Sequence, residues 1–329
     1  MKLLNSLTLS LLAVAVVLPA AAARKTVIPV ETENTQLVLV AQENGVLQTV
    51  HFGAKVSDPS AFASFRTGRG TDNGEGPMSY PATGGRYLGE PALHVKYADG
   101  YHNTELVYAD HQVVANGNVV TTKILLKDPV TFLEVTLIFD AYRKENVICA
   151  HTEIRNSGKK AVQLLNYASG ALNLDADKYY LTHFHGGWAD EMQMEGELLT
   201  HDTKVIESRR GTQVTQCNNP SFLVSLDADR LQENVGEVVA GALAWSGNFR
   251  LSFEMDESNR LTVLAGINPF ASTYELAPGK IFTTPEFIYT YSGRGAGQAS
   301  RNLHAWARNY GVYGGGQINP TLLNSWEGA

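Results

Sequence analysis

The chain has 329 residues, of which 44% are hydrophobic and 9% aromatic, so it can build a substantial core. It carries 26 lysines and arginines against 33 aspartates and glutamates, which gives a net charge of −7. Because no basic run follows the N-terminal segment, this balance argues against nucleic acid and anionic membranes as partners.

The first residues have the pattern of a secretory signal peptide. Lys2 supplies a positive start, residues 7–18 are largely apolar, and Pro19 precedes four alanines that offer cleavage sites. A membrane anchor is the alternative, but the apolar stretch is shorter than the roughly 20 residues of a spanning helix. We therefore expect residues 1–23 to be removed and the mature chain to be periplasmic or extracellular.

Residues 36–171 alternate polar and apolar side chains between turn signals, as antiparallel strands do. The runs "LVLVAQ" and "VLQTVHF" flank Asn44 and Gly45, a pair that tolerates the positive φ of a hairpin turn. Farther along, "FLEVTLIFDAY" has one fully apolar face, which predicts a strand buried on one side. This face consists of Leu133, Val135, Leu137, Phe139 and Ala141.

The stretch from Phe65 to Gly85 interrupts this pattern, because it holds six glycines and almost no regularly spaced apolar residues. It predicts a long loop, and long ordered loops are often functional. A plain surface excursion is the other interpretation, and the sequence leaves both open.

Short strands resume after Glu195. A helix is predicted only from Gly297 to Tyr310, where apolar residues fall at helical spacing. Glycines 314–316 separate this helix from a closing segment, 317–329, that has strand character. The whole pattern predicts an all-β fold of stacked antiparallel sheets. The expected later strands are "SFLVSL", "EVVAGALAW", "FRLSFEM", "RLTVLAGI", "STYEL" and "FIYTYS".

The chain has two cysteines, Cys149 and Cys217. In an oxidising compartment they could form one disulfide, or both could be buried free thiols, and the sequence does not decide between these outcomes. Two cysteines alone cannot make a cysteine-based zinc site.

Histidines offer the main candidates for chemistry. His183 and His185 would share one face of a strand and could begin a metal site, but no third ligand is specified by spacing, and structural packing competes. Nearby, Trp188 could stack on a sugar face or lie in a core. A sugar-epimerase reaction needs an acid/base pair, for which His151 with Glu153, or His183 with a distant glutamate, could serve. No G-x-S-x-G motif supports a serine hydrolase.

Motifs spread from residue 79 to the end of the chain carry a more specific signal. In chain order they include "SYPATGG", "EPALHVKYADG", "ELVYADHQV", "GGWADE", "NNPSFLVSL", "WSGNF" and "NPTLLNSWE". Singly they are moderately specific, but in this number and order they resemble the N-terminal part of glycoside hydrolase family 36, the retaining α-galactosidases. The resemblance covers essentially the whole mature chain.

This resemblance implies a large β-supersandwich at 24–294, a linker helix with a glycine-rich hinge at 295–316, and the first strand of a (β/α)8 barrel at 317–329. In the family the barrel carries both catalytic carboxylates, an Asp nucleophile and an Asp acid/base, farther along than this chain extends. We therefore expect a domain truncated at the start of the barrel, with no catalytic residue of its own and inactive alone. We predict neither a cofactor nor a metal ion.

The resemblance also implies three substrate-binding residues. Trp326 would line the galactose pocket at the end of the first barrel strand of a complete enzyme. Asp72 and Tyr80 lie in the loop that, in the family, can approach an active site, in some members that of a neighbouring subunit. A homo-oligomer is thus compatible with the resemblance, and the implied partners are an α-galactoside or other carbohydrate and the missing barrel. The alternative is a stand-alone carbohydrate-binding module that uses Trp188 and Tyr80.

Overall fold

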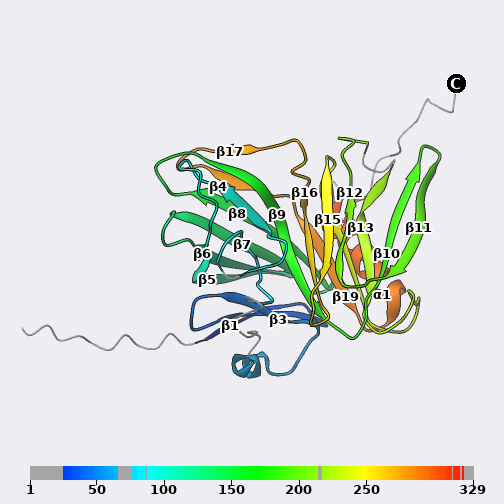
Figure 1. Cartoon of the computed structure of the whole chain (residues 1–329). Coiled ribbons are helices and arrows are strands. Elements are labelled where there is room, and N and C mark those ends of the chain that lie inside the picture. The colour runs from blue at the N-terminus through cyan, green and yellow to red at the C-terminus, as the bar shows by residue number, and fades with distance from the viewer. Residues whose placement is uncertain are drawn as a thin grey trace, which may run out of the picture.

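The computed structural model describes residues 25–65, 76–85, 87–213, 217–312, 314–318 and 321. This part of the chain forms three sheets and one α-helix (Figure 1). The sheet strands pair antiparallel throughout, so the predicted all-β antiparallel sandwich is confirmed. The predicted signal segment and the predicted barrel strand at the end of the chain lie outside the described residues, apart from a few of their flanking positions.

The N-terminal sheet contains β1 (Thr26–Glu31), β2 (Thr35–Ala41) and β3 (Leu47–Ala54), in that order. The expected hairpin turn between β2 and β3 is confirmed, because Gly45 has a φ of 83° and its amide donates to the carbonyl of Gln42 at 2.9 Å. A short 3-10 helix, η1 (Pro59–Ser64), follows this sheet.

The largest sheet has the order β11-β10-β13-β14-β19-β8-β7-β6-β5, with β18 paired to β8. In Figure 1 it extends from β5 and β6 to the hairpin of β10 and β11 on the opposite side of the molecule. Its strands are β5 (Val107–Asn116), β6 (Val119–Lys127), β7 (Leu133–Tyr142), β8 (Val147–Asn156), β10 (Tyr180–Gly187), β11 (Asp190–Leu198), β13 (Asn218–Ser225), β14 (Val238–Leu243), β18 (Ile281–Thr283) and β19 (Phe287–Ser292).

The third sheet has the order β12-β15-β16-β9-β17, and β4 also pairs with β9. The long strand β9 follows β8 of the large sheet directly in the chain, so the two sheets are joined at this point. The strands are β4 (Leu93–Lys96), β9 (Val162–Asp175), β12 (Asp202–Glu207), β15 (Phe249–Met255), β16 (Arg260–Ile267) and β17 (Tyr274–Leu276).

A line of aromatic rings connects the three sheets through the core. Phe253 of β15 meets Phe222 of β13 edge to face, with ring centroids 5.0 Å apart. Phe222 lies 6.2 Å from Phe287 of β19, and Phe287 lies 5.0 Å from Tyr289 on the same strand. Tyr289 in turn meets Phe52 of β3 edge to face at 5.4 Å. Such pairs contribute stability beyond the area they bury, so these rings bind the sheets into one core.

A glycine makes room for these rings on β14. A Cβ atom at Gly241 would lie 2.6 Å from the ring of Phe222 and 3.1 Å from that of Phe287. Because neither ring can retreat within a closely packed core, the strand requires a residue without a side chain here.

The helix α1 (Gly295–Trp306), extended by a π-helical turn at Ala307–Gly311, packs on the outer face of the large sheet, opposite the aromatic core. This element agrees with the helix predicted from Gly297 to Tyr310. Leu303 and Trp306 form part of its contact with the sheet. They pack against Val147, Cys149 and Ile288.

Most local predictions are confirmed. Strands β15, β16 and β19 begin and end where the sequence pattern places them, and the apolar face expected on β7 faces the core. Cys149 and Cys217 are free thiols, which settles the open question of a disulfide. In the part of the chain that the structure describes, no helix has the length and apolar character needed to cross a membrane.

We expect Phe287→Ala to lower the free energy of unfolding by about 3–5 kcal/mol, because it empties the centre of the aromatic line. Urea denaturation followed by circular dichroism measures this change. Phe270→Ala is the matched control: its ring is 51% exposed under the guanidinium of Arg209, and its loss should cost about 1 kcal/mol or less. Equal losses in the two variants would contradict the role given to the aromatic line.

Candidate functional site

The structure describes one of the three residues predicted to bind substrate, Tyr80. Its side chain is 2% exposed, and its hydroxyl donates to the carbonyl of Ala168 at 2.8 Å. This burial raises the pKa of the Tyr80 hydroxyl. The ring therefore serves the core here and presents no open face to a sugar. Asp72 and Trp326 lie outside the described residues, so their roles stay predictions.

A hollow of about 250 Å³ lies at the base of the glycine-rich loop. Phe65, the last described residue before residues 66–75, forms part of its wall. Arg260 and Asp175 also line the hollow. Nε of Arg260 lies 3.8 Å from Oδ2 of Asp175. Two residues that line the hollow, Phe65 and Pro77, lie on either side of Asp72 in the sequence.

The hairpin of β10 and β11 forms one edge of the large sheet (Figure 1). It carries exposed apolar side chains. Trp188, at its turn, is 84% exposed, and Met192 and Met194 of β11 are also exposed. Trp188 is therefore a surface residue rather than a core residue, which decides between the two interpretations that its sequence left open.

His183 and His185 lie on β10 of the same hairpin, beside two glutamates of β11. Nε2 of His183 is 3.9 Å from Glu197, and Nε2 of His185 is 3.5 Å from Glu195. Burial, assisted by the positive charge of Lys204, lowers the pKa of His183, although both glutamates oppose this effect. The described residues place neither histidine in a group of three metal-ligand side chains, so packing is the better supported of the two interpretations.

A groove of about 520 Å³ lies between α1 and the outer face of β13 and β14. Leu223 and Ala240 of the sheet form part of its floor. Charged or titratable side chains also line it, namely Glu233, Arg301 and His304. The groove is therefore apolar at its base with a few polar groups, the usual composition of a ligand site.

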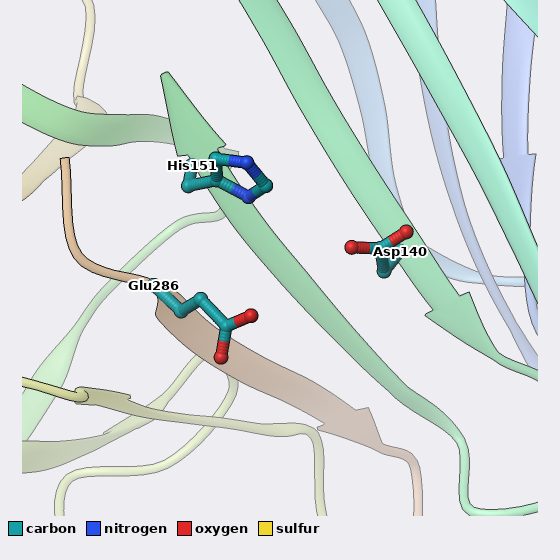
Figure 2. Close-up of side chains that lie close together, drawn as sticks. All are labelled: Asp140, His151 and Glu286. Carbon is teal, nitrogen blue, oxygen red and sulfur yellow. The ribbon is translucent and has the colours of Figure 1, made fainter. Parts of the chain in front are cut away.

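The structure also brings together a group of three side chains that the sequence did not reveal (Figure 2). Asp140 comes from β7, His151 from the adjacent β8, and Glu286 from the residue before β19. One ligand atom from each of them lies within 4.8 Å of the other two. The hydroxyl of Thr121, on β6, donates to Oδ1 of Asp140 at 2.5 Å.

The two carboxylates of this group affect a neighbouring thiol. Cys149, next to it on β8, has a thiol pKa that is raised first by burial and then by Glu286 and Asp140. The sequence suggested pairing His151 with Glu153, yet Glu153 is not a member of the group. A signal was available in the strand pattern, because Asp140 and His151 occupy outward positions between buried residues.

Comparison with known proteins confirms the resemblance seen in the motifs. Residues 45–277 match the family described as the glycosyl hydrolase family 36 N-terminal domain. The chain is 33% identical over 267 residues to α-galactosidase AgaA of Geobacillus stearothermophilus, which covers 76% of this chain and 36% of that protein. It is 28% identical over 268 residues to α-galactosidase Mel36A of Lactobacillus acidophilus, with the same two coverages. The chain thus spans little more than a third of the length of these relatives.

Solved structures show the same similarity. A variant of AgaA in complex with raffinose matches with a TM-score of 0.80 at 28% identity, over 86% of this chain and 43% of that one. Another variant of AgaA, in complex with stachyose, matches with a TM-score of 0.79 at 29% identity over the same shares. The fold described above is therefore that of the corresponding part of these enzymes.

The environment of His183 predicts a pH-dependent stability. Its folded-state pKa is lowered, so below the ordinary value of about 6.5 the unfolded chain binds more protons. Above that pH, His183 makes its full contribution to the free energy of unfolding. This contribution is lost as the pH falls toward the lowered pKa of the folded state. Urea denaturation between pH 8 and pH 5 should therefore show a smaller decline in unfolding free energy for His183→Gln than for the wild type. In His185→Gln, which retains His183, the wild-type decline should persist; equal declines in all three proteins would contradict this account.

Proposed function

Because the chain belongs to glycoside hydrolase family 36, whose N-terminal domain it matches over residues 45–277, we propose that it is the β-sandwich domain of an α-galactosidase-type enzyme. Its role is to support a (β/α)8 barrel that hydrolyses α-galactosides. The observation that carries this proposal is the match to AgaA with raffinose bound, which extends over 86% of this chain. A shared fold alone would not carry a function, but here sequence and structure agree over the same region.

The proposed substrates follow from the sugars in those structures. AgaA variants were solved with raffinose and with stachyose, and both sugars carry an α-linked galactose. In this proposal Trp326 lines the galactose pocket and Asp72 approaches it from the sandwich. Tyr80 contributes indirectly, because its buried ring holds the C-terminal part of the loop against β9.

The chain by itself should not turn over an α-galactoside. A retaining mechanism needs one carboxylate to attack the anomeric carbon and another to protonate the leaving oxygen, and the family resemblance assigns both to the barrel. We also propose export, supported by the signal-like residues 1–23, so N-terminal sequencing of the mature protein should begin near Arg24.

The test is release of nitrophenol from an aryl α-galactoside by the purified chain, which should not exceed the rate of a mock purification. A full-length α-galactosidase carried through the same procedure is the positive control. Turnover that rises in proportion to the amount of this chain would contradict the proposal.

The second candidate function is a stand-alone carbohydrate-binding module, which the exposure of Trp188 favours. An indole that is 84% exposed on a sheet edge could stack on the apolar face of a sugar. The other platform considered for such a module, Tyr80, is buried in the core.

Affinity electrophoresis in gels that contain galactomannan separates the two candidates. We expect the wild type and Trp188→Ala to migrate equally, because a supporting domain has no need to hold the polysaccharide itself. Retardation of the wild type that disappears in Trp188→Ala would establish the binding module instead. Exposed Trp245→Ala, in a different loop, controls for a general effect of removing a tryptophan.

A further inference from the structure

The group of Asp140, His151 and Glu286 has no part in the proposed function, and its position is fixed by the core. Phe139, Ala150 and Phe287 point into the sandwich, so their chain neighbours must point outward. β8 pairs with β7 on one side and with β19 on the other, which brings the three outward side chains onto adjacent strands. Figure 2 shows them converging on one space from these three strands.

The charge of this group is not balanced by a nearby cation in the described residues. None of the ion pairs that the described chain forms includes Asp140 or Glu286. The neutral hydroxyl of Thr121 donates to Asp140, but it brings no positive charge. Two carboxylates that are partly buried and close together repel each other, so the arrangement favours a bound cation.

The imidazole of His151 gives independent evidence for a bound cation. Nδ1 of His151 is buried and has no hydrogen-bond partner among the described residues. Buried polar atoms almost always have a partner, and a neutral imidazole nitrogen is the commonest protein ligand for a metal ion. The unpartnered nitrogen and the unbalanced carboxylates therefore point to the same kind of occupant.

We propose that Asp140, His151 and Glu286 bind one divalent transition-metal ion, with Zn²⁺ as the preferred ion and water completing the coordination. Ligand atoms around such an ion lie roughly 3–3.5 Å apart, since each is about 2.1 Å from the metal. Their present spread of up to 4.8 Å needs only small side-chain rotations to reach that arrangement. A mixed nitrogen and oxygen set suits Zn²⁺ or Mn²⁺ better than Ca²⁺ or Mg²⁺, which prefer oxygen alone.

The role of this ion is structural. It would join β7, β8 and the start of β19, three strands whose side chains line the aromatic core on their other face. Because binding requires all three strands in place, the ion stabilises the folded state and not the unfolded chain. This site differs from the sequence-based prediction, which gave the chain no metal.

Isothermal titration of the EDTA-treated, dialysed mature chain with ZnCl₂ tests the proposal. We expect one equivalent to bind and the melting temperature to rise by roughly 5 °C at saturation. CaCl₂ titrated in the same way should give no saturable binding. Absence of Zn²⁺ binding would overturn the proposal.

Conservative variants locate the site. His151→Gln and Asp140→Asn should each weaken Zn²⁺ binding at least tenfold and abolish the thermal shift. Asp140→Asn also removes a repelling charge, so it should fold at least as well as the wild type without metal. Glu153→Gln is the matched control, because it removes a carboxylate from β8, two residues from His151 and outside the group.

The two histidines of the β10–β11 hairpin are the other place where Zn²⁺ could adhere. Binding that survives His151→Gln and Asp140→Asn, but is lost in His185→Gln, would therefore contradict the proposal. Zinc K-edge absorption of the loaded wild type gives a readout that does not depend on variants. It should show a first shell of nitrogen and oxygen ligands with the outer-shell scattering of one imidazole ring, and a spectrum without imidazole scattering would equally contradict the assignment.

Discussion

The line of aromatic rings from Phe253 to Phe52 is the contact on which the rest of the structure depends, because it is shared by all three sheets. Side chains alternate strictly along a strand, so a ring that points inward fixes the direction of its neighbours. Phe287, for example, sets both Glu286 and Ile288 on the outer face. The inner packing thereby determines where α1 docks and where outward polar groups meet.

The outer face consequently has distinct regions. Apolar residues such as Cys149 and Ile288 lie where Leu303 and Trp306 of α1 cover them. Beside this contact, a groove is lined by residues of α1, β13 and β14. The polar group of Asp140, His151 and Glu286 lies on the same face of β7, β8 and β19.

Much of the fold could be predicted from the sequence, because its information is local. The alternating pattern of β7, the ends of β15 and the hairpin at Gly45 each depend on a few neighbouring residues. The polar group could not be predicted, since Asp140 and Glu286 are brought together only by the pairing of β8 with both β7 and β19. Tyr80 shows the reverse difficulty, because a polar aromatic in a glycine-rich segment suggested exposure, yet its hydroxyl is satisfied inside the core. Burial of this kind is set by distant residues, here Ala168.

In the proposed function, this sandwich is one domain of an α-galactosidase-type enzyme. Reading the genomic DNA downstream of the codon for Ala329 tests it most directly. We expect an open frame that continues from "NPTLLNSWE" into a (β/α)8 barrel carrying two aspartates as nucleophile and acid/base. A stop codon directly after Ala329, found in independent clones with no barrel-encoding frame following, would contradict it.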